Sequence, residues 1–223
     1  SITVGRSIKT VQPGAFSGTS ELLAIHWNSD TKITEDCLSP AKNCLMYVTA
    51  KTEVPTKWYN IIRDGVADSI DIADKYTYNC ETAFKAKKIV FRKTFSLQTG
   101  RGESKGWESI ALPFDVTSVM FGSRKLAPFG TDMTNATPFW LRELNLDKGF
   151  SSATGIVAHK PYIIAVPNNS TYDEDYNVSG EVEFIAASTA GVDIPATPTT
   201  LEKSEGPVSY THLRAHETDS YLV

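Results

Sequence analysis

Short runs of β-branched, aromatic and aliphatic residues recur along this sequence, separated by Gly, Pro and Asn. Residues 181–186 alternate with a period of two, so Val182, Phe184 and Ala186 are expected to point inward while the glutamates between them face solvent. No stretch carries a long helical apolar period, so the pattern predicts a mainly β protein. Further strands are expected at residues 45–48, 89–95, 107–116, 139–144 and 161–166.

The first 50 residues contain a repeated pattern of apolar positions. Four positions of the first copy return about 22 to 23 residues later: Val11 as Ile33, Phe16 as Leu38, Leu22 as Leu45 and Ile25 as Val48. This interval lies within the ~20–29 residues of leucine-rich repeats, in which each apolar position stacks on its counterpart in the next repeat. The pattern predicts the end of a solenoid, with an ordinary loop-and-strand segment as the alternative.

These patterns divide the chain into four parts. Residues 1–50 are expected to form terminal leucine-rich repeats and residues 51–86 a connecting or capping segment. Residues 87–200 are expected to form an antiparallel β-sandwich module, because strands recur there with Pro, Gly and Asn breaks between them. Residues 201–223 are expected to be a disordered tail.

Composition narrows the classes of protein that fit. The 223 residues have a formal net charge of −4 and are 41% hydrophobic, which supports a folded core. The mild acidity argues against a non-specific nucleic-acid binder, because that function requires a basic surface. No apolar run approaches the ~20 residues of a membrane-spanning helix. We therefore expect neither a nucleic-acid partner nor a membrane span within this sequence.

The potential metal ligands do not have metal-site spacing. Cys37, Cys44 and Cys80 contain no C-x-x-C pair. The sequence favours three small buried apolar side chains, although one disulfide with one cysteine left over stays possible in an exported protein. The acidic stretch at 173–177 begins like a calcium loop but lacks the glycine and glutamate that such a loop requires, so a solvated turn is expected. The sequence predicts no metal site and no cofactor.

The sequence offers no catalytic constellation. His26 and His159 are isolated along the chain, and no nucleophile motif or phosphate-binding loop accompanies them. Glu21, Asp115 and Glu143 have no spacing that indicates a pair of catalytic carboxylates. We therefore expect that this protein is not an enzyme.

Aromatic residues are the most plausible ligand-binding groups. Four tryptophans and nine tyrosines offer surfaces for stacking on sugars or for anchoring a protein partner. Most of them are expected in or near the core. Trp58 and Tyr59 follow a polar break rich in Pro, Thr and Lys, so we expect this pair to be exposed and to be the candidate ligand-binding site.

The segment from Ile8 to Ile25 resembles the BspA-type leucine-rich repeats of bacterial surface proteins. It follows the pattern I-x-x-V-x-x-G-A-F-x-G-x-x-x-L-x-x-I, although Thr19 stands where that family often has Cys. Four later runs resemble a β-rich module that follows such repeats in secreted or surface proteins of anaerobic gut and oral bacteria: GWESIALPFDV, FWLREL, HKPYII and PNN. Together the two resemblances cover most of the chain before the tail.

The resemblance implies an exported, non-enzymatic protein of the bacterial surface or the medium. Such a protein would bind host or bacterial surface proteins or glycans through a rigid repeat scaffold. The resemblance brings no catalytic residue with it. Two further interpretations stay open, namely a carbohydrate-binding accessory module of a polysaccharide-degrading system and a purely architectural cap or stalk.

The end of the chain has a different origin in our interpretation. Residues 208–223 begin VSYTHLRAHET, which back-translates to a string resembling the transposase end and adapter of shotgun sequencing libraries. His212, His216 and Glu217 spell a metal-like HxxxHE and are discounted for that reason. A genuine polar tail is the alternative. The chain is then expected to be a gene fragment that is native to about residue 207, with the signal peptide for export lying outside it.

Overall fold

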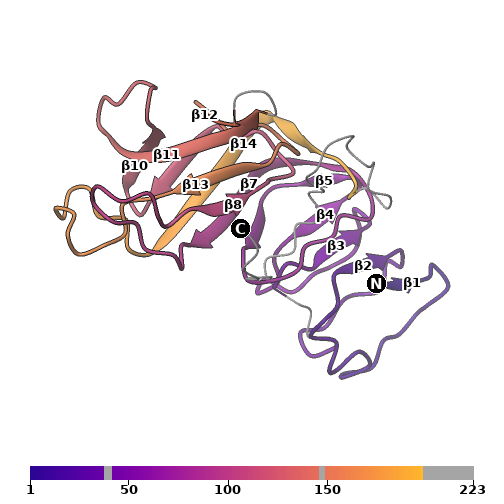
Figure 1. The fold of residues 1–223 in the computed structure, drawn as a ribbon. Coiled ribbons are helices and arrows are strands. Elements are labelled where there is room, and N and C mark those ends of the chain that lie inside the picture. The colour runs from indigo at the N-terminus through magenta and orange to yellow at the C-terminus, as the bar shows by residue number, and fades with distance from the viewer. Residues whose placement is uncertain (38–41, 146–148, 198–223) are drawn as a thin grey trace. The chain divides into compact units, whose positions relative to one another are not determined.

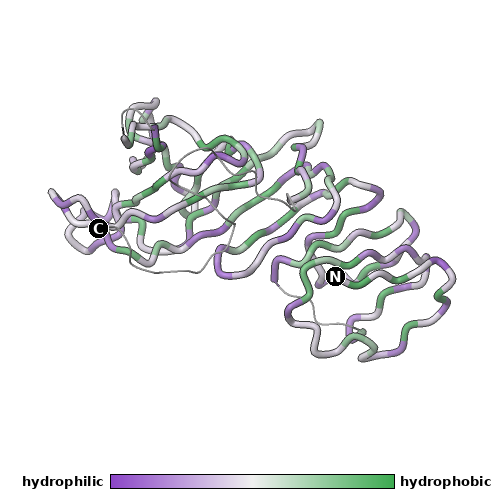
Figure 2. Tube along the Cα trace, turned by 45° about the vertical axis from the view of Figure 1, so that its right-hand side comes forward, coloured by the Kyte–Doolittle hydropathy of each residue, from purple (hydrophilic) through white to green (hydrophobic). Residues whose placement is uncertain are grey.

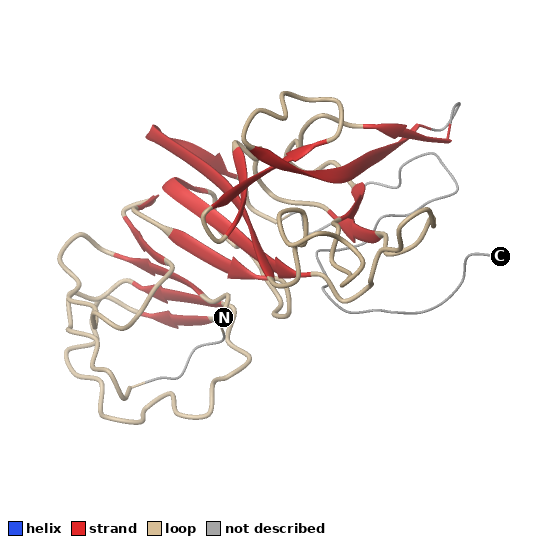
Figure 3. Cartoon of the chain, turned by 90° about the vertical axis from the view of Figure 1, so that its left-hand side faces the viewer, coloured by secondary structure: helices blue, strands red, loops and turns tan. Residues whose placement is uncertain are grey.

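The computed structural model describes residues 1–37, 42–145 and 149–197. These residues form fourteen β-strands and no helix, and the strands form a β-solenoid of about five turns (Figure 3). The chain divides into two compact units, namely Ser1–Ile89 with the described residues from Ser188 onward, and Val90–Ala187. The tail at 201–223, including the adapter-like residues 208–223, lies outside the described residues.

The first unit is built on a ladder of parallel strands (Figure 1). Strands β1, β2, β3 and β4 pair in parallel in chain order, so each coil of the chain returns to the same side before the next strand begins. Strand β5 pairs in parallel with β7, to which β6 also pairs. The solenoid therefore continues past residue 50, through the segment that the sequence assigned to a connector. The strands are β1 (Ile2–Val4), β2 (Ala24–Trp27), β3 (Leu45–Val48), β4 (Ile61–Arg63), β5 (Val66–Ala67), β6 (Ile70–Ala73) and β7 (Phe84–Thr94).

The interior of these coils is filled by alternate strand residues. Ile25 and Trp27 of β2 have no exposed surface, and Met46 and Val48 of β3 lie beside them in the same core. Figure 2 shows hydrophobic and hydrophilic positions interleaved along the chain rather than separated into blocks. Parallel in-register strands stack like residues on like residues, which explains why apolar positions recur at a repeat-like interval.

The register of the repeat differs from the predicted one. Ile25 lies beside Met46, two residues short of Val48, which was its predicted counterpart. Apolar spacing alone cannot choose between Met46 and Val48, which both face the core, whereas hydrogen bonds between neighbouring coils fix a single register. Leu38, another predicted counterpart, lies outside the described residues.

Two buried asparagines fasten successive coils to β6. Asn60 is 1% exposed and has a backbone φ of 58°. Its side-chain amide donates to the Asp71 carbonyl at 3.0 Å, and its side-chain carbonyl accepts from the Asp71 N–H at 2.7 Å. Asn43, which is fully buried, exchanges the same two hydrogen bonds with Ala73. Each asparagine thus supplies both a donor and an acceptor to the backbone of one β6 residue.

The variant Asn60→Ala should lower the free energy of unfolding by about 2 kcal/mol, measured by urea denaturation. The change removes two hydrogen bonds from a buried backbone and places alanine in the left-handed region. Asn135→Ala is the matched control, because Asn135 has a similar φ of 55° but is exposed. Equal losses in the two variants would show that the side-chain bonds of Asn60 contribute nothing.

The second unit is a sheet with one buried face. Strand β14 pairs with β9, β9 with β10, β11 with β12 and β13, and β13 with β8, all antiparallel, while β10 and β11 are parallel. Parts of β7 and β14 belong to this unit. The strands are β8 (Glu108–Ile110), β9 (Ser118–Phe121), β10 (Arg124–Pro128), β11 (Ala136–Asn145), β12 (Gly149–Ser152), β13 (Tyr162–Ala165) and β14 (Glu181–Ile194).

The alternation in β14 is confirmed, since Val182, Phe184 and Ala186 are at most 1% exposed. A two-sheet sandwich over residues 87–200 is not shown. The paired strands of this unit follow one path of neighbours, and buried loop residues such as Leu112 and Phe114 complete the core. Strand β11 is not an edge strand, because it pairs with β10 and β12 on one side and with β13 on the other.

Candidate functional site

The residues predicted to bind ligand lie in the loop before β4. Trp58 is partly buried and packs against the solenoid core. Tyr59 is 46% exposed, and the Lys42 ammonium lies 4.5 Å from the centre of its ring. The two residues therefore do not present a pair of free rings, and Tyr59 supplies most of the accessible aromatic surface at this place.

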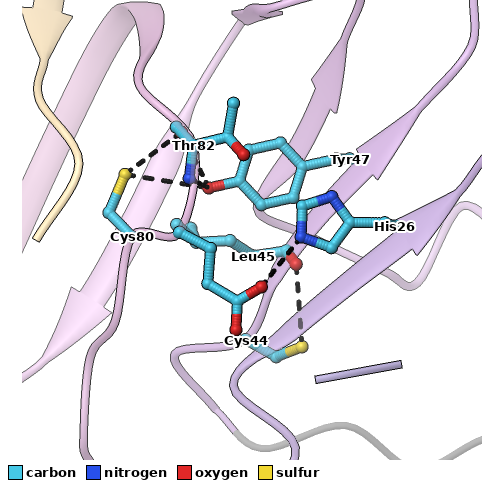
Figure 4. Close-up of polar contacts among 7 residues, drawn as sticks. His26, Cys44, Leu45, Tyr47, Cys80 and Thr82 are labelled. Carbon is cyan, nitrogen blue, oxygen red and sulfur yellow. Dashed lines mark hydrogen bonds and ion pairs between the residues drawn. The ribbon is translucent and has the colours of Figure 1, made fainter. Parts of the chain in front are cut away.

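His26 is not isolated, contrary to the expectation from sequence. It lies level with Tyr47 on neighbouring parallel strands, and the two rings stack with centroids 4.6 Å apart and an interplanar angle of 2° (Figure 4). That distance matches the spacing of adjacent strands, so the register itself produces the stack. The His26 Nε2 lies 2.9 Å from Glu81 Oε2. The cluster joins residues 55 positions apart in the sequence.

A covering segment, Cys80–Thr82, crosses the face of the sheet that carries these two rings (Figure 4). The Tyr47 hydroxyl donates to the Thr82 carbonyl at 3.0 Å and lies 3.7 Å from Cys80 Sγ. Partial burial acts to raise the pKa of Glu81, but hydrogen bonds from His26 and Ser1 outweigh it and hold the pKa below its usual range. These contacts tie the covering segment to the solenoid through a carboxylate and a phenol.

This cluster does not form a nucleophilic site in the described residues. Burial raises the pKa of the Cys80 thiol, which donates to the Thr82 carbonyl at 3.3 Å, so the sulfur is protonated at neutral pH. Burial also raises the pKa of Tyr47. His26 is bonded to Glu81 rather than to the thiol, so no base lies beside the sulfur to activate it. The arrangement fastens a segment and activates no group.

All three cysteines are buried, as expected for small apolar side chains. Cys37 and Cys44 lie in the solenoid core, and Cys80 belongs to the covering segment, with its sulfur beside the Tyr47 hydroxyl. The structure holds them as free thiols. Burial raises the pKa of Cys44 to about 12 and also raises that of Cys37.

The motif residues of the second unit hold loops in place. Glu108 accepts the backbone N–H groups of Ser96 and Leu97 at 2.7 and 2.8 Å and pairs with Lys93 at 2.8 Å. Asn168 accepts the Thr99 N–H at 3.0 Å and donates to the Leu97 carbonyl at 3.0 Å. Structural roles of this kind account for the charged and polar positions of the GWESIALPFDV and PNN runs.

The remaining carboxylates that the sequence drew attention to also serve as local partners. Asp115 accepts the Ala158 N–H at 2.7 Å, and Glu143 pairs with Lys160. His159 donates its backbone N–H to the Leu112 carbonyl at 2.7 Å. Each of the two carboxylates therefore has its own partner in the loop before β13, and the two do not form a shared site.

The acidic stretch at 173–177 forms a turn whose carbonyls face a cation of the protein itself. The Arg124 guanidinium donates to the carbonyls of Glu174, Asp175 and Asn177. These backbone oxygens are therefore already in contact with a positive charge of the chain. Within the described residues, no group of three or more His, Cys, Asp and Glu side chains could hold a metal ion.

An exposed row of aromatic side chains crosses the second unit, and no common spacing in the sequence links its members. The aromatic row consists of Trp107, Trp140 and Phe129. Phe129 follows β10 and lies level with Trp140 of β11, because Pro128 pairs with Phe139, and the two ring centroids are 5.4 Å apart. Phe129 is 44% exposed, and both tryptophans are partly exposed.

Trp107 lies on the same face two strands away from Trp140. Ala165 of β13 pairs with Trp140 of β11. On the other side of β13, Ile164 pairs with Glu108, so the next residue, Ala165, lies opposite Trp107. The Arg142 guanidinium, two residues along from Trp140, lies 5.0 Å from the centre of the Trp107 ring. Ala165 is only 1% exposed, so the larger side chains on either side cover it. The row is therefore continuous across four neighbouring strands.

No protein family, no curated protein and no solved structure matches this chain. Among the residues that the structure describes, none forms a helix long and apolar enough to cross a membrane. The fold and the sites therefore define the class by themselves, which is an all-β protein with a parallel solenoid and an exposed aromatic sheet face.

Proposed function

We propose that this chain is a non-enzymatic binding protein that holds a glycan on the aromatic row of its second unit. The observation that carries the proposal is the row itself, in which three exposed or partly exposed rings from separate strands share one sheet face. Aromatic faces stack on the apolar faces of sugar rings, and a flat row suits an extended chain. The proposal corresponds to a carbohydrate-binding module of a secreted or surface protein.

The rigid placement of the rings supports this function. Phe129 and Trp140 stand next to or on strands that pair with a neighbour on each side, and Trp107 stands next to β8, which pairs with β13. Trp107 stands two strand spacings from Trp140, with β13 between them, which corresponds to about 10 Å at the normal strand spacing. That separation is comparable to the length of a disaccharide unit. A pre-ordered surface loses little conformational entropy when a ligand binds.

Adhesion to proteins through the repeat scaffold has less support from the geometry. The covering segment and Phe84 lie against the sheet face that carries His26 and Tyr47, so this part of the repeat face is already in contact with the protein's own chain. The BspA-type identity of the solenoid stays part of the proposal. It is supported by Phe16, which packs against the core and donates its N–H to Cys37 of the next coil.

The variant Trp140→Ala should weaken glycan binding by at least about tenfold, because the central ring of the row is lost. A panel of soluble polysaccharides, including β-glucans, xylans and methyl-esterified pectin, would identify a bound glycan, and titration calorimetry would measure the affinity. Phe129→Ala should have a similar but smaller effect. Thermal unfolding of each variant would separate loss of the surface from loss of the fold.

Tyr59→Ala is the matched control, since it removes the exposed ring of the pair predicted from sequence. It should leave the affinity unchanged within about twofold. An unchanged affinity in folded Trp140→Ala protein, or a wild-type protein that binds no glycan of the panel, would refute the proposal. A loss of binding in Tyr59→Ala alone would show that the glycan binds at the loop before β4 and not at the aromatic row.

A further inference from the structure

The aromatic row carries a cation whose charge is not neutralised. Arg142 is exposed, and the interaction that the structure gives its side chain is with the Trp107 ring. Its cross-strand neighbours are Ser152 and Ile163, which carry no charge. The next residue, Glu143, alternates to the other side of the strand and pairs with Lys160. Arg142 thus makes no ion pair among the described residues.

A free guanidinium held against a ring is a specific recognition element. The stack with Trp107 limits the directions that the side chain can take and leaves the N–H groups of its edge available. A guanidinium edge matches a carboxylate with two parallel hydrogen bonds. The same ring that would stack on a sugar therefore positions a cation beside that sugar.

We propose that the ligand of the aromatic row is an acidic polysaccharide, whose sugar rings lie along the row and place an anionic group on Arg142. This inference rests on the proposed function, because it assigns the ligand class of the same site. The chain as a whole has a net charge of −4, which repels a polyanion. Binding of such a ligand therefore depends on a locally positive position, and Arg142 provides it within the row.

Polygalacturonate and its fully methyl-esterified form provide the test, because they share one backbone and differ in charge. The wild-type protein should bind polygalacturonate at least about tenfold more tightly than the ester at low ionic strength. Arg142→Gln should bring the affinities for the two polymers to within about twofold of each other, because the anionic groups lose their guanidinium partner. Dextran sulfate, measured in parallel, distinguishes a carboxylate-specific contact from attraction to any anionic sugar polymer.

Lys125→Gln is the matched control for charge. Lys125 is an exposed cation on the same face of β10 as Phe129 but four residues away from it. Its removal should leave the preference for polygalacturonate intact. Equal affinity of wild-type protein for the two polymers, or equal losses in Arg142→Gln and Lys125→Gln, would overturn the inference while the row still binds sugar. If Trp140→Ala changes binding of neither polymer, the proposed function fails and the inference fails with it.

Discussion

Glu108→Gln is expected to lower the free energy of unfolding by about 3–5 kcal/mol, because it breaks a buried ion pair on one side only. The side chains of Lys93 and Glu108 are 8% and 12% exposed, and they approach to 2.8 Å. Glutamine can still accept the N–H groups of Ser96 and Leu97, but it cannot neutralise the Lys93 ammonium. Denaturation in urea at pH 7 measures the loss.

The double variant Lys93→Met, Glu108→Gln is the control for this result. Removing both charges should recover much of the stability, because the main cost of the single variant is a buried charge without its carboxylate. If the single and double variants are equally unstable, the loop contacts of Glu108 rather than its charge stabilise the unit.

The contribution of the same ion pair should also appear in how the free energy of unfolding changes at acid pH. Partial burial acts to raise the pKa of Glu108, but the Leu97 N–H and Lys93 outweigh it and lower the pKa. Because its pKa is lower in the folded state, the ionised carboxylate stabilises the folded protein at pH values above the unfolded pKa of about 4.3. This stabilisation is lost as pH falls through the folded pKa. Between about pH 5 and pH 3, wild-type protein should therefore lose more stability than Glu108→Gln.

Cys44 is expected to react with iodoacetamide about a thousandfold more slowly in the native protein than in urea at pH 7. Burial raises the pKa of this thiol from 9.0 to about 12, so the reactive thiolate is that much rarer in the folded state. Pulsed alkylation followed by mass spectrometry of the peptides would give the rate at each of the three cysteines.

The pH dependence separates this cause from steric protection alone. The rate at an ordinary thiol levels off above about pH 9, whereas the rate at Cys44 should keep rising about tenfold per pH unit up to pH 10. Cys44→Ala assigns the peptide signal. Native labelling as fast as denatured labelling would contradict the burial of this thiol. Uptake of fewer than three alkyl groups in urea without reductant would contradict three free thiols.

Local patterns located six of the fourteen strands, including the three longest, β7, β11 and β14. The runs at 45–48, 139–144 and 161–166 became β3, part of β11 and β13, because a strand needs only a few suitable residues in succession. Alternation also predicted the buried face of β14 correctly. Partners of these strands were harder to predict, since a pleated pattern states which side is buried but not which strand lies next to it.

For the candidate sites too, the sequence indicated single residues but not which residues lie together. Trp58 and Tyr59 were expected to be exposed because they follow a polar break, yet Trp58 packs against the core. Trp107, Phe129 and Trp140 have no common spacing, and only the pairing of β8, β13, β11 and β10 brings them onto one face. The outward position of Trp140 in the alternating FWLREL run was the one local sign of this site. The His26–Glu81 contact had no local sign at all.

The sequence by itself determined that this protein is mainly β, that its first part is repetitive and that its cysteines are buried. These properties follow from the spacing of apolar and polar residues that are close together in the sequence. The tertiary structure decided the register of the solenoid, its extension past residue 50 and the aromatic row with Arg142. These features depend on hydrogen bonds between segments far apart in the chain. Such bonds select one pairing among several that satisfy the same hydrophobic pattern.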